Sequence, residues 1–459
     1  MDRTKKVFHC TLCLLLIFAF FSSPMLVFAS QVPDYIKVGL KYGSTAVSSC
    51  RLTSETGFQI INVEDDAFEE TLPISAYTDL TASVENGMVV LRSEDGSVIS
   101  TSLGKDDCIM TMDYEKDGLI YYEGKPYRDG IQLIPDGNNK IMVLNYITMD
   151  HYLYGVLQGE MGQAAPLEAL KAQAVAARSY AMTNLYVHKS YGFHVCATTH
   201  CQVYNGYSWE KEKTNQAVDE TSGKILYSDG KPAAAYYHKN SGGYTQNSKD
   251  VWSTQLPYLA AVKDEYCPDY SWTATMSFDQ IQSRLEVCGY DPGTVQSVSI
   301  SARNESGAVS ELTIVGNKNT ITLKKESVRT VLGGSSLKST QFSISSDSSK
   351  NTSNGNALSV SNGSQSANVN QSLVIISSSG NKQVHNVDGL VVSNGGSKQT
   401  ISGKSSSVTE TVTNGSVTFE GKGYGHGIGM AQDSAIAMAN QGMRYDEILK
   451  YFYTDAEIY

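Results

Sequence analysis

Tryptophan, proline and charged residues are scarce in this chain of 459 residues. It has 3 Trp and 10 Pro, and Asp, Glu, Lys and Arg together make up 18% of it. This composition excludes a collagen and a coiled coil, and the 41% of hydrophobic residues excludes disorder of the whole chain. The formal net charge of −11, without basic clusters, argues against a nucleic-acid partner. At about 100–200 residues per domain, the length allows two or three domains.

The first 29 residues have the pattern of an export signal. Arg3, Lys5 and Lys6 precede the apolar run Val7 to Phe21, and small residues stand at the −3 and −1 positions of a cleavage site after Ala29. We therefore expect an exported, extracytoplasmic protein, with an uncleaved membrane anchor as the alternative. No later segment has 18 consecutive apolar residues, so we expect no further membrane span.

Removal of this segment leaves an even number of cysteines, which permits disulfides in an exported protein. The candidate pairs are Cys267 with Cys288 and Cys50 with Cys108. Cys196 and Cys201 have a different setting, which is considered below.

The pattern of apolar residues predicts an α+β protein. Short alternating runs between residues 30 and 124 indicate a β-rich N-terminal region. An Ala-rich helix is expected from Leu167 to His188, because apolar residues recur there every three or four positions. Lys171 and Arg178 lie two turns apart on another face of this helix.

A Ser/Asn-rich insert interrupts the remainder of the chain. Residues 341–410 contain 20 Ser and 9 Asn, a composition that is usually flexible. Within them, residues 374–383 are echoed by residues 390–399, so two small β units are expected. We place the insert at about 345–415, inside a second region that covers 125–459.

Glu160 is the first candidate for chemistry. It lies between glycines just before the long helix, where we expect a loop. Such a loop can hold a carboxyl in a partly desolvated cleft, as general acid–base catalysis requires. The alternative is a solvated surface residue.

Four ordered motifs resemble the SpoIID/LytB family, which contains stage II sporulation protein D and amidase enhancers. The matching segments read YLYGV (152–156) with EM (160–161), PLEALKAQAVAAR (166–178), HKNSGGY (238–244) with DVW (250–252) and PYL (257–259), and GKGYGHGIGMAQ (421–432) with the closing DEILKYFY (446–453). One departure is that residues 162–165 are GQAA where the family often has Pro-x-x-Trp. The resemblance covers about residues 125–459.

The resemblance implies a lytic transglycosylase that cleaves the β-1,4 bond between N-acetylmuramic acid and N-acetylglucosamine in peptidoglycan glycan stripped of its peptides. The family's catalytic acid corresponds to Glu160, and its basic helix residues correspond to Lys171 and Arg178. These two would bind the lactyl group of muramic acid or orient Glu160; the alternative is a solvated helix face. Asp150 and Glu168 are candidates for a second carboxyl, although Glu168 also suits the start of a helix.

The two glycine-rich motifs are expected to shape the wall of the cleft. His238, Ser241 and Tyr244 come from one motif, and Tyr424 and His426 come from the other. Glycines let a sugar approach backbone amides, and Tyr424 is suited to stacking on a sugar. The alternatives are a tight turn at Ser241 and a structural role for His426.

The short segment that contains Cys196, His200 and Cys201 predicts a structural zinc site, because zinc takes Cys and His ligands in tetrahedral sites. Some clostridial SpoIID relatives carry zinc in a comparable loop, which favours metal over the alternative, a disulfide between Cys196 and Cys201. His194, His188 or water would supply the fourth ligand.

Two other functions compete with the transglycosylase. One is a non-catalytic wall-binding protein that stimulates a cell-wall amidase, which would not need Glu160. The other is a zinc-dependent hydrolase, for which no HExxH-type spacing is present. The resemblance implies a role in wall remodelling during sporulation, with peptidoglycan glycan as the partner, a cell-wall amidase as a second partner, and no organic cofactor.

Overall fold

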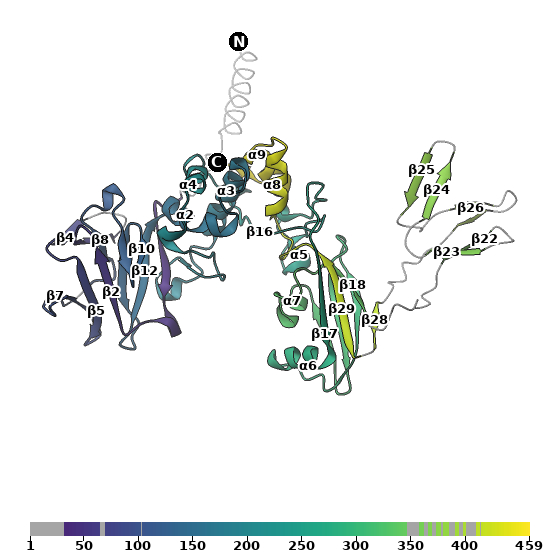
Figure 1. The fold of residues 1–459 in the computed structure, drawn as a ribbon, viewed down its shortest axis with the longest axis horizontal. Helices are drawn as coiled ribbons and strands as arrows, with labels where there is room; N and C mark the ends of the chain where they lie inside the picture. Colours follow the sequence, from purple (N-terminus) through teal and green to yellow (C-terminus); the bar gives the residue numbers. More distant parts are fainter. Residues whose placement is uncertain are drawn as a thin grey trace, which may run out of the picture. The chain divides into compact units, whose positions relative to one another are not determined.

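The computed structural model describes residues 32–346 apart from 65–68 and 102, six short strands between 358 and 400, and residues 410–459 apart from 414. The chain forms two compact units. The first unit contains residues up to Glu160, residues 177–234 and residues 456–459; the second contains residues 161–176 and 235–455. The predicted α+β class is confirmed (Figure 1).

A seven-stranded sheet forms the centre of the first unit. Its strands in spatial order are β13 (Val195–Cys196), β1 (Tyr35–Lys41), β12 (Ile141–Thr148), β11 (Gly130–Pro135), β8 (Asp107–Thr111), β3 (Phe58–Asn62) and β4 (Glu69–Ile74). The run from Ile141 to Ile147 is buried throughout, as expected of a strand covered on both faces. β12 leads directly into helix α2 (Met149–Glu160), so the sheet fixes where that helix begins.

A second sheet in this unit has six strands. In spatial order they are β10 (Lys125–Tyr127), β9 (Ile120–Tyr122), β2 (Ser49–Ser54), β5 (Asp79–Glu85), β6 (Met88–Ser93) and β7 (Val98–Ser100). The predicted boundary at residues 124 and 125 does not divide the compact units. It falls in the hairpin between β9 and β10, and β11 and β12 pair with β8 and β1. The prediction of a β-rich region at 30–124 agrees with these strands.

Helix α3 (Leu167–Thr183) begins as predicted, directly after Pro166, whose carbonyl accepts the amide of Leu170. Its predicted end at His188 is wrong. The side chain of Asn184 donates to the Tyr180 carbonyl at 2.7 Å, and the Asn184 amide bonds to Ala181, which closes the helix in a tight turn. The residues from 184 to 188 therefore form turns and do not continue the helix.

Short elements complete the first unit. They are α4 (Glu212–Asp219), the 3₁₀ helices η1 (Gly43–Thr45), η3 (Tyr114–Lys116), η4 (Lys189–Tyr191) and η5 (Gly206–Trp209), and a small sheet of β15 (Lys231–Pro232), β14 (Leu226–Ser228) and β31 (Glu457–Ile458).

Two antiparallel sheets make up most of the second unit. One consists of β17 (Ser271–Ser277), β29 (Ser416–Lys422) and β21 (Phe342–Ser345), and the other of β20 (Thr320–Lys324), β19 (Val309–Gly316), β18 (Val295–Arg303) and β28 (Thr411–Val412). Their apolar residues share one core with α6 (Phe278–Val287) and α7 (Ser327–Leu332). The remaining elements are η6 (Pro257–Leu259), the parallel pair β16 (Tyr237–His238) and β30 (Met430–Ala431), and the helices α5 (Ser248–Val251), α8 (Gln432–Asn440) and α9 (Tyr445–Phe452).

The insert contains hairpins where its sequence repeats. β24 (Leu373–Ser377) pairs with β25 (Gly380–Val384), and β26 (Val391–Ser393) pairs with β27 (Lys398–Thr400). These two hairpins coincide with the two predicted β units. A third hairpin, β22 (Leu358–Ser361) with β23 (Ser366–Val369), was not predicted.

The predicted disulfides are absent from the described residues. All six cysteines there have free thiols. Cys50 lies on β2 of the six-stranded sheet and Cys108 on β8 of the seven-stranded sheet, so each is buried in its own sheet. Cys267 lies in a loop and Cys288 at the exposed end of α6.

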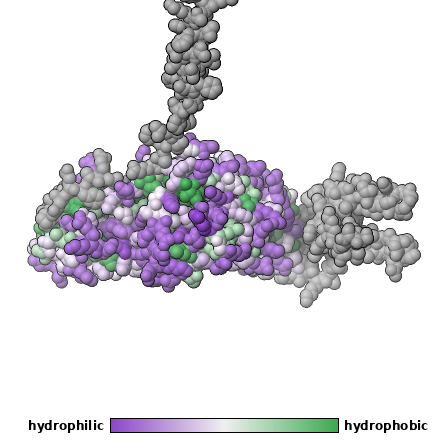
Figure 2. Space-filling model, turned by 90° about the horizontal axis from the view of Figure 1, so that it is seen from above, coloured by the Kyte–Doolittle hydropathy of each residue, from purple (hydrophilic) through white to green (hydrophobic). Residues whose placement is uncertain are grey.

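The face shown in Figure 2 is largely hydrophilic, with small separate hydrophobic groups. Within the described part of the chain, every helix is too short or too polar to cross a membrane. The predicted export signal lies outside the described residues and stays a prediction.

Candidate functional site

Glu160 is the last residue of α2 and not part of a loop, which corrects the expected setting. Its side chain is half-buried. Gly155 and Gly159 give this helix a low propensity, but aromatic rings occupy the space beside both glycines. A Cβ at Gly155 would lie 2.5 Å from the ring of Tyr204, and one at Gly159 would lie 2.2 Å from the ring of Trp209. Tertiary packing therefore forms α2 and places Glu160 at its end.

Arg178 lies inside the first unit and not on a solvated helix face. Its side chain is 0% exposed and its Nη2 donates to Asp150 at 2.9 Å. Nη1 donates to the carbonyls of Thr221 and Lys224 at 2.8 and 3.1 Å, whereas Nε has no partner. Burial lowers the pKa of the guanidinium, against the opposing effect of Asp150. These contacts join α3 to the first turn of α2 and favour a positioning role for Arg178 over binding of a lactyl group.

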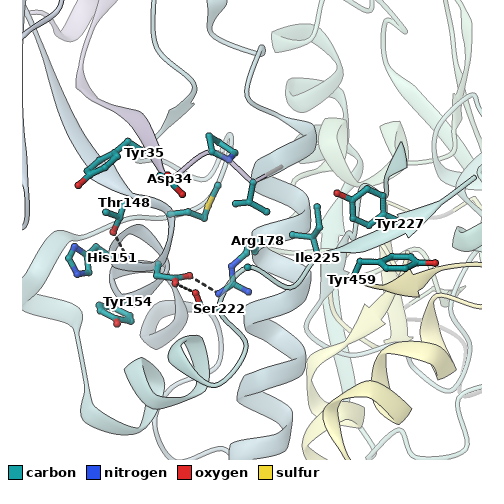
Figure 3. A pocket seen from close by; sticks show the side chains of 15 residues that line it. Asp34, Tyr35, Thr148, His151, Tyr154, Arg178, Ser222, Ile225, Tyr227 and Tyr459 are labelled. Carbon is teal, nitrogen blue, oxygen red and sulfur yellow. Dashed lines mark hydrogen bonds and ion pairs between the residues drawn. The ribbon is translucent and has the colours of Figure 1, made fainter. Parts of the chain in front are cut away.

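A pocket of about 960 Å³ opens beside the ion pair of Asp150 and Arg178. Arg178 and Ser222, which are labelled in Figure 3, both donate to the carboxylate of Asp150. Four tyrosines line this pocket: Tyr35, Tyr154, Tyr227 and Tyr459. The pocket adjoins the start of α2, and Glu160 is at the other end of this 12-residue helix.

The predicted residues at the start of α3 belong to the second unit. Lys171 Nζ donates to Glu168 at 2.9 Å, and the second carboxylate oxygen of Glu168 accepts the amide of Tyr445 at 2.8 Å. Glu168 thus holds the start of α9, in addition to its favourable place in the first turn of α3. Asp150 and Glu168 are thus both engaged in ion pairs, and a role for either as a second carboxyl stays a prediction.

Four side chains form a cluster that fits a tetrahedral metal. Ligand atoms of Cys196, His200, Cys201 and His188 all lie within 4.8 Å of one another. The Cys201 sulfur is 3.4 Å from His188 Nε2 and 3.5 Å from His200 Nδ1, and the Cys196 sulfur is 3.9 Å from His200 Nδ1. Ligands at the usual Zn–S and Zn–N distances stand about 3.5 Å apart in a tetrahedron. The donor set and its spacing therefore fit zinc.

His188 is the fourth member of this cluster, and His194 is not. Nδ1 of His194 accepts the backbone amide of Lys37 at 3.0 Å. His188 instead stacks on Phe193 with ring centroids 4.7 Å apart. Phe193 in turn covers Gly39, where a Cβ would lie 2.6 Å from its ring. This stack holds His188 beside Cys201.

The pairing of strands β1 and β13 fixes the position of the Cys196 thiol, because Cys196 lies opposite Gly39 in this register. Burial opposes ionisation of this thiol, but hydrogen bonds from Thr198, Tyr42 and Cys201 together outweigh burial and lower the pKa of Cys196 to about 6. A thiol that ionises readily suits metal ligation. The thiols of Cys196 and Cys201 are both free in this structure.

The two glycine-rich motifs lie against each other in the second unit. Asn240 and Tyr424 exchange backbone hydrogen bonds of 3.0 and 2.8 Å. Gly242 has φ +69° and a Cβ there would lie 3.2 Å from the amide nitrogen of Gly423. The glycines thus allow backbone to pack on backbone, in agreement with the tight turn that was the alternative at this motif. Ser241 is buried and donates to Asp264 at 2.6 Å.

The two predicted tyrosines differ in exposure. Tyr244 is 40% exposed, whereas Tyr424 is half-buried with Lys338 Nζ 5.1 Å from its ring centroid. Sugar stacking by either tyrosine stays a prediction.

The predicted histidines come together, with ring centroids 5.7 Å apart. His238 is 5% exposed, its Nδ1 donates to the Ile428 carbonyl at 3.1 Å, and its Nε2 has no partner. His426 accepts the Ile428 amide at 3.0 Å and also bonds to the backbone of Tyr237. Trp252 lies beside His426, with centroids 5.5 Å apart. These contacts favour the structural alternative for His426.

Because of this histidine pair, acid should destabilise the folded protein. Burial lowers the pKa of His238 from 6.5 to about 4 and that of His426 to about 3. The unfolded chain therefore binds more protons than the folded chain between those values and 6.5. Stability is complete above about pH 6.5 and falls as the pH drops toward 4; the loss from His238 alone is about 2 kcal/mol at pH 5. Urea unfolding followed by tryptophan fluorescence measures it, and His238→Gln should flatten the pH dependence. An unchanged slope in His238→Gln would contradict the assignment.

The fold and these clusters define an α+β protein with a half-buried carboxyl at a helix end and a Cys₂His₂ cluster in one unit. A family model described as "Stage II sporulation protein" (SpoIID) matches residues 137–227, which include α2, α3 and the cluster. The chain therefore carries a SpoIID-family domain. A second model, a domain of unknown function (DUF8618), matches residues 262–360.

Relatives extend this similarity. The chain is 34% identical over 304 residues to the amidase enhancer of Bacillus subtilis, covering 66% of this chain and 39% of that protein. It is 28% identical over 330 residues to stage II sporulation protein D of Bacillus amyloliquefaciens, covering 68% and 74%. It is also 29% identical over 357 residues to an uncharacterised protein of Brachyspira hyodysenteriae, covering 75% and 77%. The chain thus spans well under half of the amidase enhancer's length.

Proposed function

We propose that this protein is a lytic transglycosylase that cleaves the bond between N-acetylmuramic acid and N-acetylglucosamine in peptide-stripped peptidoglycan glycan. The SpoIID domain and the names of the relatives support a cell-wall-related role. The observation that carries the finer proposal is the engagement of the two other candidate carboxyls. Asp150 and Glu168 are both held in ion pairs, so the site favours chemistry that needs one carboxyl.

In this mechanism Glu160 acts first as an acid and then as a base. Its proton passes to the glycosidic oxygen as the bond from that oxygen to C1 of muramic acid breaks. The C6 hydroxyl of the same sugar attacks C1, and the Glu160 carboxylate takes the proton of that hydroxyl. The product is a 1,6-anhydro sugar and no water is consumed.

We also propose that His188, Cys196, His200 and Cys201 hold a structural zinc. Four protein ligands complete a tetrahedron and leave no open position for a reacting water, so this site does not favour the zinc hydrolase. When bound, zinc would join β13 to the turn after α3.

Analysis of the products tests the reaction. Purified residues 30–459 are incubated with denuded glycan strands, and the fragments are identified by mass spectrometry. Anhydro-muramic ends, lighter than hydrolysed ends by one water, are the expected products. Reducing ends would instead indicate a hydrolase and contradict the mechanism.

An enhancer of a cell-wall amidase is the second candidate function, and the name of the 34% identical relative favours it. It predicts no cleavage of glycan but a faster release of peptides when an N-acetylmuramoyl-L-alanine amidase is added. These two results together would favour the amidase enhancer and contradict the lytic transglycosylase. Export to the cell wall and a role in sporulation belong to both candidates.

A further inference from the structure

Trp209, outside the four family motifs, packs on Gly159, the residue that precedes the proposed acid in α2. It ends the 3₁₀ helix η5, and the six-membered ring of its indole lies on the backbone of Gly159. A Cβ at Gly159 would be 2.2 Å from Cζ3 and 2.9 Å from Cε3 of that ring. Gly159 immediately precedes Glu160, so the indole packs on the last turn of α2, which also carries the carboxyl.

The segment that carries Trp209 is held firmly in the first unit. The next residue, Glu210, receives two hydrogen bonds from Arg128, at 2.8 and 3.0 Å. The Arg128 guanidinium also lies 5.0 Å from the ring centroid of Tyr207. Arg128 thus holds residues on both sides of Trp209 in the sequence. This limits the conformational freedom that Trp209 would lose on binding a ligand.

The indole is nevertheless accessible. Trp209 is 38% exposed, whereas Trp272 is 8% exposed and Trp252 is half-buried. A large aromatic ring that is fixed and partly exposed is a typical anchor of a binding surface. Pyranose rings present an apolar face of C–H groups that packs on such a ring, while their hydroxyls stay in water.

We propose that Trp209 is a stacking platform for a pyranose ring of the glycan strand that is offered to Glu160. This inference rests on the proposed function for its ligand. The smallness of Gly159 is part of the platform, because any side chain there would push the indole away.

Binding is measured in the Glu160→Gln background, so that no substrate is consumed. The probe is a set of denuded glycan oligosaccharides, titrated by calorimetry and by tryptophan fluorescence. Trp209→Ala should weaken binding about 10-fold, whereas Trp209→Phe should keep most of it. Tyr290→Ala is the matched control, because Tyr290 is 37% exposed in the other unit, and it should bind like the parent.

Gly159→Ala separates stacking from stability. Alanine favours a helix over glycine by about 1 kcal/mol, but its methyl group would displace the indole. Binding should weaken although the helix is favoured. If Trp209→Ala does not fold, Gly159→Ala and Trp209→Phe still test whether Trp209 binds the glycan.

The outcomes distinguish the platform from the reaction. If the wild type cleaves no glycan but Trp209→Ala still weakens binding, the transglycosylase fails and the platform stands. If Trp209→Ala and Gly159→Ala both bind as the parent does, the platform is overturned, whatever the reaction. Trp209 would then be a packing residue of α2.

Discussion

Replacing Glu160 with glutamine is expected to abolish cleavage of denuded glycan while the protein stays folded. Glutamine keeps the size of the side chain but has no proton to donate to the leaving oxygen. The loss should be at least ~1000-fold, because this one group supplies both proton transfers of the proposed mechanism. The rate at which anhydro ends appear, measured by mass spectrometry, gives the result.

A neutral change elsewhere serves as the control. Glu212 is an exposed carboxyl in the first turn of α4, and Glu212→Gln should turn over glycan like the wild type. Equal melting temperatures of both variants would show that folding is unaffected. Cleavage by Glu160→Gln at more than a few per cent of the wild-type rate would exclude Glu160 as the acid.

Loss of the proposed zinc should have the largest effect on stability. The wild type is expected to contain one zinc per chain, and Cys201→Ser should contain far less and melt ~10 °C lower, because the ligand cluster then loses the metal that joins its segments. Elemental analysis and thermal unfolding with and without a chelator measure both effects.

His194→Gln provides the matched control for the ligand set. His194 is close in sequence, but its Nδ1 bonds to the Lys37 amide, so this variant should keep its zinc. A wild type without zinc that melts unchanged in chelator would refute the metal site. A Cys196–Cys201 disulfide in its mass spectrum would establish the alternative.

Local patterns predicted the parts of the fold that depend on neighbours in sequence. Pro166 and the spacing of apolar residues gave the start of α3, and the repeated segments of the insert coincide with hairpins. The end of α3 was missed, because it depends on the side chain of Asn184 bonding to Tyr180 instead of on apolar spacing.

Distant partners decided what the sequence could not predict. The two glycines of α2 argue against a helix, and only the rings of Tyr204 and Trp209 explain why one forms. In the same way, the spacing of Cys196, His200 and Cys201 indicated a metal, but the choice of His188 over His194 depends on β1 and Phe193.

The route of the chain between its two units has a consequence for how the protein can be divided. The chain passes from one unit to the other after residues 160, 176, 234 and 455. The second of these crossings, after residue 176, lies inside helix α3. No single cut, by a protease or by a gene truncation, can therefore release either unit with all its elements. A recombinant form of either unit would therefore need a chain whose segments are rejoined in a new order.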